Sequence, residues 1–370
     1  MNFDYLIVGA GLAGSVCANL LNAAGKKVII LEKRDNVGGN LRCEDINGII
    51  CHKYGAHIFR TSNRTVWDYV NQFAEFVPFV NSPIANYKGE LYNLPFNMNT
   101  FYQLWGCKSP EEAKEEIAKR VERIDNPKNL EEHCMALVGY EIYEKFIKGY
   151  TKKQWGKDCS ELPADIMRRI PLRFTFDNNY FNDIWQGIPK GGYNKFIGNI
   201  IGNIPVLTGV DINKNKEYES IGDSVIYTGA VDEYFNYSCG RLEWRSLTFE
   251  NHIIGSTDNY QGVAVMNYTD SDVPYTRSIE HKHFLKQQCN GTVVTYEYPH
   301  PASDDNEPYY PINDERNNRI YGKYKELTDS MKKHYFVGRL AEYKYYDMQD
   351  TITRAMRLCE WLLKKHTLQK

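Results

Sequence analysis

Three glycines near the N-terminus constrain the fold of this 370-residue chain more than any other feature. They form the pattern Gly9-x-Gly11-x-x-Gly14, which follows an apolar run from Tyr5 to Val8 and precedes an apolar segment from Val16 to Leu21. This order predicts a strand, a tight turn and a helix. Glycines at such a turn let backbone N–H groups meet a pyrophosphate at the helix N-terminus.

An acidic residue stands where the next strand is expected to end. The apolar run Val28 to Leu31 is closed by Glu32. A carboxylate at this point of a βαβ unit holds the ribose hydroxyls of a bound dinucleotide. Glycines that serve only a turn are the alternative, but the strand, the helix and the acidic partner together favour a dinucleotide-binding unit.

A second glycine pair distinguishes a flavin from a nicotinamide. The segment from Glu32 and Lys33 continues to Gly38-Gly39-Asn40, and this resembles the extended FAD fingerprint, in which a second glycine loop runs beside the cofactor. An ordinary hairpin turn is the alternative. No second G-x-G-x-x-G occurs downstream, so a separate NAD(P) domain is not expected, and the predicted cofactor is FAD.

Composition excludes several classes of protein. The 45 Lys and Arg residues nearly balance the 47 Asp and Glu residues, which argues against a nucleic-acid-binding surface. The nine cysteines are odd in number and never spaced as C-x-x-C, which is typical of free thiols in a reducing compartment. No basic leader and no apolar stretch near about 18 residues is present. We therefore expect a cytoplasmic protein without a membrane span.

The pattern of elements predicts a discontinuous α/β fold. Ser109-Pro-Glu-Glu112 is predicted to form a capping box, and Asn129 to open a second helix. Short alternating strands are expected over 242–249, 262–268 and 292–298. The expected organisation is a Rossmann-like FAD-binding domain with an inserted helical lobe and an antiparallel β-sheet domain. Its predicted segments are 1–80, 190–240 and 325–370 for the FAD-binding domain, 97–165 for the helical domain, and 81–96, 166–189 and 241–324 for the sheet and substrate domain.

Arginines and aromatic residues recur together. Tyrosine is far more frequent than phenylalanine, with 28 against 16 residues. The rigid fork of arginine binds phosphate oxygens through two hydrogen bonds, so arginines that converge on one cleft neutralise a diphosphate. Solvated surface arginines and tyrosines packed in a sheet are the alternative. His281-Lys-His283 is expected to place two imidazoles on one strand face, without a third ligand for a metal.

A set of motifs in order along the whole chain closely resembles the bacterial UDP-galactopyranose mutases. Beyond the glycine patterns, the motifs are Tyr54-Gly-Ala-His57-Ile-Phe59, Gly149-Tyr150-Thr-x-x-Gln-Trp155, Arg169-x-Pro-x-Arg173 with Asn179-Tyr180-Phe181, Arg277-x-x-Glu-His-Lys-His-Phe284, Glu307-Pro-Tyr-Tyr-Pro311 and Gly338-Arg-Leu-x-x-Tyr-x-Tyr-Tyr-Asp347.

The resemblance implies an isomerase that interconverts UDP-galactopyranose and UDP-galactofuranose without net redox change. In that family, N5 of reduced FAD attacks the anomeric carbon, UDP departs, and the sugar ring recloses through another hydroxyl before UDP returns. Since the flavin is the nucleophile, no protein nucleophile is required.

The resemblance also implies roles for individual residues. The expected catalytic residues are His57, Arg169, Arg277 and Arg339. The expected cofactor-binding residues are Gly9, Gly11, Gly14, Glu32, Lys33, Gly38, Gly39, Asn40, His57, Arg339 and Asp347. The expected substrate-binding residues are Arg60, Asn81, Phe146, Tyr150, Thr151, Trp155, Arg169, Tyr180, Arg245, Asn267, Arg277, Tyr310, Tyr345 and Asp347. No metal ligand is expected.

One position departs from the family pattern. The usual H-I-F-H motif reads His57-Ile-Phe-Arg60 here, which replaces a histidine by a longer, permanent cation with five N–H donors. We hypothesise that Arg60 reaches an acetamido carbonyl and that UDP-N-acetylgalactosamine is a substrate. A different hydrogen bond in an unchanged pocket is the alternative.

Two other functional classes share the glycine patterns. An amine-oxidase-like FAD oxidoreductase would consume oxygen or another acceptor, and a binding protein without turnover would bind UDP-sugar and form no product. The resemblance further implies a homodimer and a loop near 166–179 that closes over substrate. The reductant, NAD(P)H or a partner protein, is not determined by the sequence.

Overall fold

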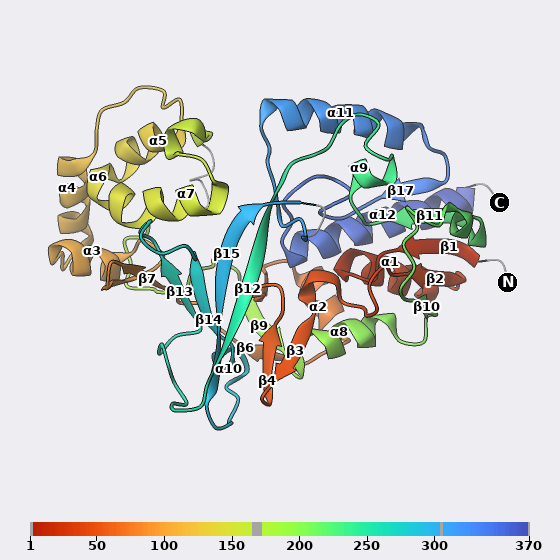
Figure 1. The fold of residues 1–370 in the computed structure, drawn as a ribbon, viewed down its shortest axis with the longest axis horizontal. Helices are drawn as coiled ribbons and strands as arrows, with labels where there is room; N and C mark the ends of the chain where they lie inside the picture. Colours follow the sequence, from red (N-terminus) through yellow and green to blue (C-terminus); the bar gives the residue numbers. More distant parts are fainter. Residues whose placement is uncertain (1–2, 165–171, 304–305, 369–370) are drawn as a thin grey trace.

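The predicted βαβ unit forms the centre of a parallel sheet. A computed structural model describes residues 3–164, 172–303 and 306–368, and Figure 1 shows their arrangement. Within them, a five-stranded sheet has the order β10-β2-β1-β11-β17, with every pairing parallel. Its strands are β1 (Phe3–Val8), β2 (Val28–Leu31), β10 (Val206–Leu207), β11 (Gly222–Tyr227) and β17 (His334–Phe336).

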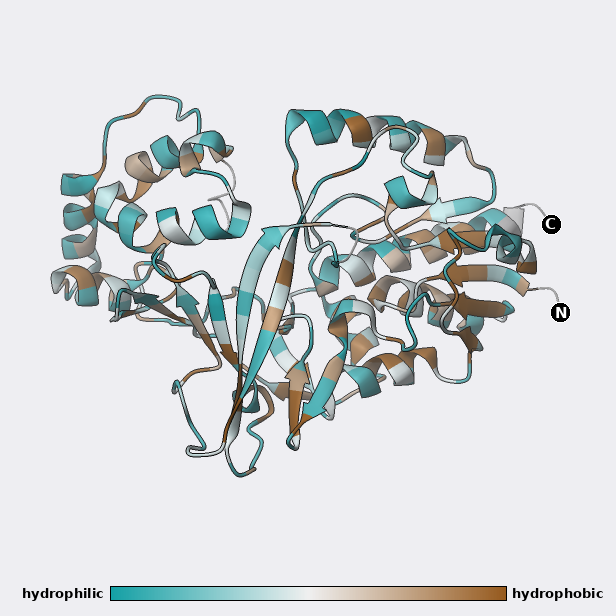
Figure 2. Cartoon of the chain, in the orientation of Figure 1, coloured by the Kyte–Doolittle hydropathy of each residue, from teal (hydrophilic) through white to brown (hydrophobic). Residues whose placement is uncertain are grey.

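Helices cover both faces of this sheet, which is why its strands are nearly continuous apolar runs. On one face, α1 packs between α8 and α12 and buries Val16, Ile200 and Leu362. The hydropathy colouring shows this apolar layer around β1 and β2, whereas the outer helices α4 (Pro110–Arg120) and α11 (Glu315–Ser330) are mostly hydrophilic (Figure 2). The helices of this half are α1 (Leu12–Ala23), α2 (Arg64–Val70), α8 (Gly192–Ile201), α9 (Val231–Tyr234), α11 (Glu315–Ser330) and α12 (Met348–Leu368).

A second, mostly antiparallel sheet stands between this half and the helical lobe (Figure 1). Among the described residues it has seven strands in the order β16-β12-β15-β14-β13-β7-β8, and only β13 and β7 pair in parallel. Its strands are β7 (Ile84–Tyr87), β8 (Glu90–Asn93), β12 (Trp244–Ile254), β13 (Val265–Tyr268), β14 (Arg277–Glu280), β15 (Thr292–Pro301) and β16 (Tyr310–Pro311). Strand β12 extends beyond the expected end at 249 because its pairing with β15 continues to Ile254↔Thr292.

Two smaller sheets lie beside helices α8 and α12. They consist of β3 (Cys43–Ile46) with β4 (Ile49–His52), and of β5 (Phe59–Thr61), β9 (Trp185–Pro189) and β6 (Phe76–Pro78). The sequence places 166–189 with the antiparallel domain, but β9 pairs with the N-terminal strands β5 and β6. Trp185 stacks on Trp67 at 5.7 Å between ring centroids, and a side chain at Gly187 would collide with the carbonyl of Val77.

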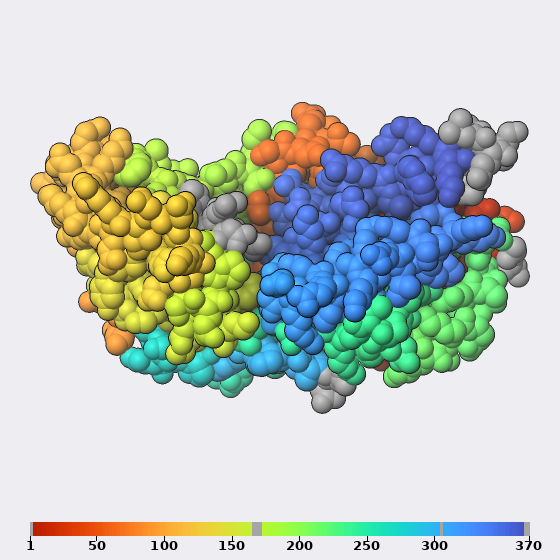
Figure 3. Space-filling view, turned by 90° about the horizontal axis from the view of Figure 1, so that it is seen from above, coloured from red at the N-terminus to blue at the C-terminus, as the bar shows by residue number. Residues whose placement is uncertain are grey.

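The helical lobe lies at one end of the molecule, and α11 and α12 lie toward the other (Figure 3). Its helices are α3 (Met98–Trp105), α4 (Pro110–Arg120), α5 (Leu130–Leu137), α6 (Gly139–Ile142), a π-helical turn (Tyr143–Lys148) and α7 (Gly149–Trp155). Ser109 and Asn129 cap α4 and α5 as expected. The Glu112 carboxylate, however, accepts the backbone N–H of Lys108 rather than that of Ser109. No helix in the described ranges is long and apolar enough to span a membrane.

Candidate active site

The glycines of the first turn are required by close backbone contacts. A Cβ at Gly14 would lie 1.9 Å from the carbonyl oxygen of Gly9, and Gly9 itself has φ +100° with Thr228 Oγ1 2.2 Å from its Cβ position. Gly11 begins α1 without a side-chain cap, and no acidic residue stands in the first turn. The N-terminal N–H groups of α1 therefore remain available to an anion.

The second glycine loop lies against the first. A Cβ at Gly39 would lie 3.0 Å from Gly11 Cα, and both Gly38 and Gly39 have positive φ. Glu32 is buried, and its carboxylate accepts the backbone N–H of Ala10 at 2.7 Å. This buried carboxylate beside two side-chain-free loops fits a dinucleotide, with the pyrophosphate at α1 and the ribose at Glu32.

One cleft of about 1010 Å³ connects these loops with the rest of the site. From the expected cofactor residues, its lining includes Gly9, Gly11, Glu32, Lys33, Gly38, Gly39, Asn40, His57, Arg339 and Asp347. Gly14 lies behind the turn, inside α1. The cleft thus leads from the dinucleotide loops to His57, Arg339 and Asp347.

Arg277 forms an ion pair with Glu297 inside the antiparallel sheet. It faces Glu297 across β14 and β15, and its Nη2 donates to both carboxylate oxygens at 2.8 Å while Nε donates to Oε1 at 3.0 Å. The Glu297 side chain is fully buried, and that of Arg277 is 23% exposed. Glu297 therefore fixes the guanidinium, and Nη1 takes no part in these three bonds. Sequence reasoning missed Glu297, since only strand register brings it to Arg277.

Tyrosines surround this arginine. Burial raises the pKa of Tyr150 to about 12 and also raises the pKa of Tyr180 and Tyr310, while the charge of Arg277 acts in the opposite direction on all three. Tyr310 stacks on Tyr345 at 5.7 Å, and Arg339 lies over the Tyr345 ring at 4.7 Å. The raised pKa values keep these hydroxyls protonated, so they are hydrogen-bond donors beside Arg277.

Asn267 offers an unsatisfied acceptor next to Arg277. The two residues are directly opposed in the pairing of β13 with β14. The Oδ1 of Asn267 is buried and lacks a hydrogen-bond partner in the described structure. A buried amide oxygen without a partner is costly, and a ligand donor would satisfy it.

Arg60 bridges two carboxylates. Its Nη1 contacts Asp183 at 2.5 Å, its Nη2 contacts Asp347 at 2.8 Å, and its guanidinium lies over the Phe181 ring at 4.5 Å. Burial raises the pKa of Asp347, which the charge of Arg60 partly offsets. The structure thus adds Asp183, 123 positions away in sequence, as a partner that the sequence did not reveal.

His57 and Arg339 are held by backbone groups. Arg339 donates from Nε and Nη2 to the carbonyl of Tyr346 at 3.2 and 2.7 Å. The Nδ1 of His57 lies 2.8 Å from the carbonyl of Gly55. Burial, with smaller contributions from Arg339 and Arg277, lowers the pKa of His57 to about 4. His57 is therefore neutral at physiological pH.

The other expected substrate residues lie beside the tyrosines, on α7 or in the core of the helical lobe. Trp155 lies 6.4 Å from Tyr310 between ring centroids, and Thr151 is buried on α7. The backbone carbonyl of Asn81 accepts the N–H of Tyr180. Phe146 packs on Tyr92 and Phe96 in the core of the helical lobe.

Arg245 is turned onto α7 rather than free in the cleft. It is buried, and it donates from Nε to the carbonyl of Gln154 at 2.8 Å and from Nη2 to that of Lys153 at 3.1 Å. A substrate contact by Arg245 or Phe146 stays a prediction that these contacts do not favour. Arg169 and the centre of the expected loop lie outside the described residues.

His281 and His283 do not lie on a strand as expected. His281 is the N-cap of the short helix α10 (Lys282–Leu285), and His283 lies within that helix. His283 contacts the Glu280 carboxylate at 3.2 Å. Among the described residues, no three His, Cys, Asp or Glu side chains group as metal ligands would.

Known proteins match the chain over nearly its full length. The profile of the family described as UDP-galactopyranose mutase matches residues 145–345, and that of an NAD(P)-binding Rossmann-like domain matches residues 7–73. The chain is 41% identical to a probable UDP-galactopyranose mutase of Klebsiella pneumoniae over 98% of this chain and 95% of that protein. It is 37% identical to a dTDP-fucopyranose mutase of Escherichia coli over 98% of both chains.

A solved structure shares the fold. A crystal structure of reduced UDP-galactopyranose mutase superposes with a TM-score of 0.74 at 16% identity, over 98% of this chain and 94% of the other. The Rossmann-like half, the inserted helices and the antiparallel sheet are thereby confirmed as the fold, and the resemblance drawn from the motifs is confirmed by the relatives. This chain belongs to the UDP-galactopyranose mutase family.

Proposed function

We propose that this chain interconverts UDP-galactopyranose and UDP-galactofuranose with reduced FAD as cofactor. Membership of a mutase family supports the isomerase class. The observation that carries the proposal is the Arg277–Glu297 pair, whose carboxylate is fully buried. Tyrosines surround this pair, and Tyr345 and Arg339 connect it with the cleft of the dinucleotide loops. A site for a diphosphate thus adjoins a site for a flavin.

The residues of the chain supply binding, orientation and electrostatic stabilisation. When bound, reduced FAD supplies the nucleophile for the anomeric carbon. Arg277 and the hydroxyls of Tyr150 and Tyr310 stabilise the charge that develops on the departing diphosphate, because donors fixed in advance need no reorganisation. Arg169, matched only by the family motif, is proposed to assist Arg277.

The test is product formation by the dithionite-reduced holoprotein. Incubation with UDP-galactopyranose should give the furanose isomer on chromatography, with no stoichiometric acceptor. Arg277→Lys keeps the charge but loses the fork, and it should lower kcat by about 100-fold. Lys364→Met, on the exposed surface of α12, is the control. Oxygen consumption with an amine would instead support the oxidoreductase alternative, and UDP-sugar binding without product would support a binding protein.

The sugar specificity is proposed to include a 2-acetamido group. Arg60 is held by Asp183, Asp347 and Phe181, and its charge lowers the pKa of Tyr180 slightly against the larger effect of burial. Its ion pairs use one N–H of each terminal nitrogen, which leaves three donors for an acetamido carbonyl. The relative that acts on dTDP-fucopyranose makes the nucleotide and sugar worth testing directly.

Parallel assays of UDP-galactose, UDP-N-acetylgalactosamine and dTDP-fucose decide this point. Turnover of the acetamido sugar should fall in Arg60→His more than turnover of UDP-galactose. Equal rejection of the acetamido sugar by both proteins would contradict the hypothesis, and preference for dTDP-fucose would reassign the substrate.

The assembly and the reductant also belong to the proposal. We infer a cytoplasmic homodimer whose flavin is reduced by NAD(P)H or by a partner protein. Light scattering at micromolar concentration measures the mass against the 43.0 kDa chain. Anaerobic loss of flavin absorbance on addition of NADPH tests the reductant.

A further inference from the structure

Two buried histidines, His281 and His52, and the half-buried His57 form a chain of hydrogen bonds that begins behind the cleft and ends in it. The backbone N–H of His57 lies 3.1 Å from His52 Nδ1, and the backbone N–H of His52 lies 3.2 Å from His281 Nδ1. The chain continues from His281 Nε2 to Thr295 Oγ1 at 2.7 Å, and from there to Asn251 Oδ1 at 2.6 Å. Only His57 lines the cleft, and the mechanism above gives the other two no role.

The directions of these bonds assign a tautomer to each imidazole. A backbone N–H can only donate, so Nδ1 of His52 and of His281 must be unprotonated acceptors, and both rings carry hydrogen on Nε2. The carbonyl of Gly55 can only accept, so His57 carries hydrogen on Nδ1. The remaining nitrogen of His57, Nε2, is then an acceptor on the ring that lines the cleft.

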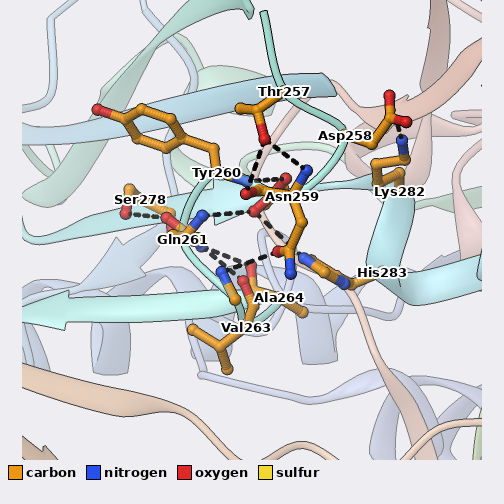
Figure 4. A network of polar contacts seen from close by, with 12 residues as sticks. Thr257, Asp258, Asn259, Tyr260, Gln261, Val263, Ala264, Ser278, Lys282 and His283 are labelled. Carbon is orange, nitrogen blue, oxygen red and sulfur yellow. Dashed lines mark hydrogen bonds and ion pairs between the residues drawn. The ribbon is translucent and has the colours of Figure 1, made fainter. Parts of the chain in front are cut away.

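The His281 end of the chain is fixed independently. Glu280, the preceding residue, is fully buried, and its carboxylate oxygens accept the backbone N–H groups of Tyr260 and Gln261, each at 2.9 Å. Figure 4 shows the surrounding network, in which Gln261 also bonds Ser278. The end of β14 is thereby tied to a neighbouring loop, and His281 has little freedom to move.

Packing holds His52 and the carbonyl side of His57. The His52 ring stacks on Phe284 with centroids 4.8 Å apart and planes at 3°, and it meets the edge of Tyr193 at 5.4 Å. The Tyr193 hydroxyl donates to the carbonyl of His57 at 2.9 Å. The backbone N–H of His57 is therefore bonded to the His52 side chain, five positions earlier, and its carbonyl to the Tyr193 side chain of α8.

We propose that His52 and His281 are positioning residues. His52 accepts the backbone N–H of His57, His281 accepts that of His52, and together they hold the His57 ring at the flavin end of the cleft. Only the changes in turnover predicted below rest on the proposed function. A misplacement of about 1 Å in a group at a reacting centre lowers rates by about 100-fold. This chain of hydrogen bonds should therefore affect turnover, although neither His52 nor His281 touches substrate.

A matched pair of substitutions separates hydrogen bonding from packing. His52→Asn keeps an acceptor in the place of Nδ1 and loses the ring, whereas His52→Phe keeps the ring and loses the acceptor. The holoenzyme should lose about 10- to 100-fold in kcat with Phe and about threefold with Asn, with KM for UDP-sugar little changed. His281→Phe and His281→Asn should show the same order. His252→Phe, at an exposed histidine of β12, is the control.

Two readouts do not depend on turnover. The visible spectrum of the oxidised flavin should shift in His52→Phe and be restored in His52→Asn. In the ¹⁵N-labelled wild-type holoprotein, NMR shifts should show His52 and His281 protonated at Nε2 and His57 at Nδ1. The proposal would be overturned if His52→Phe kept a kcat and a flavin spectrum at least as close to wild type as His52→Asn does. It would also be overturned if His52 were protonated at Nδ1. If the wild type gives no furanose, the proposed function fails. The flavin spectrum and the tautomers still test whether His52 and His281 position His57.

Discussion

At the scale of single residues, the proposed diphosphate site depends on one buried carboxylate. Glu297 has no exposed surface, and it receives three of the hydrogen bonds that Arg277 donates. It fixes the arginine and removes rotamer freedom before substrate arrives, and such pre-organisation favours stabilisation of developing charge. It also partly neutralises the arginine, so the tyrosine hydroxyls are needed to complete the site.

Glu297→Gln should impair both stability and turnover. Glutamine offers one oxygen and turns an N–H group toward the guanidinium, which leaves a largely buried cation without its counter-charge. Loss of one partner of a buried pair costs about 3–5 kcal/mol, so Tm of the holoprotein should fall by about 5 °C or more. Differential scanning fluorimetry measures Tm, and the furanose assay measures kcat. Glu326→Gln on α11 serves as the control, and an unchanged Tm with wild-type kcat would refute this account of Glu297.

At the scale of elements, α7 is fastened to the antiparallel sheet by two cations. Arg245 of β12 donates to the last carbonyls of the helix. Lys153 of α7 donates from Nζ to the carbonyls of Tyr268 and Tyr275, at 2.9 Å each. Because α7 carries Tyr150, this attachment determines where that hydroxyl lies relative to Arg277.

The attachment should give stability a pH dependence. Burial lowers the pKa of Lys153 from 10.5 to about 8, and Asp270 and Asp272 act weakly in the opposite direction. Between these two values the unfolded chain binds more protons than the folded one, so the contribution of Lys153 to stability rises with pH. The difference in Tm between wild type and Lys153→Met should therefore increase from about pH 8 to 10.

Thermal denaturation of the two holoproteins in parallel measures this difference, and groups common to both cancel. Lys152→Met removes an exposed lysine that pairs with Asp158, and it should leave the profile unchanged. If the Tm difference between wild type and Lys153→Met stayed constant across this pH range, the pKa of Lys153 would not be lowered by burial.

At the scale of the whole molecule, the two proposed ligand sites lie on different sheets. The dinucleotide loops follow strands of the parallel sheet, whereas Arg277 and Glu297 lie on the antiparallel sheet. The chain passes repeatedly between the two halves, and Tyr345 with Arg339 joins their sites. Each ligand should therefore stabilise the protein through its own half.

A pair of variants should separate these effects. Gly14→Ala places a methyl group on the Gly9 carbonyl, so FAD should no longer raise Tm while UDP still does. Arg277→Lys should show the reverse. A ligand at 100 times its Kd contributes about 2.7 kcal/mol, which scanning fluorimetry resolves. Gly198→Ala on α8, where a Cβ meets nothing within 4 Å, should keep both shifts. Loss of both shifts in Gly14→Ala would contradict separate sites.

The sequence by itself determined the nucleotide-binding half and the family. The glycine turn, Glu32 and Gly38-Gly39 lie within 31 consecutive positions, and their chemistry follows from local backbone geometry that residue type dictates. The ordered motifs identified the family for the same reason, since they are short and local. Helix caps at Ser109 and Asn129 were likewise predictable.

Only the tertiary structure decided which residues serve as partners. Glu297 meets Arg277 through strand register, Asp183 meets Arg60 across 123 positions, and His281 meets His52 across 229. For the same reason Arg245 binds backbone carbonyls of α7, and His281 is a helix N-cap instead of a strand residue. A buried charge or imidazole takes the partner that packing brings within hydrogen-bond distance, and that choice is not encoded in its sequence neighbours.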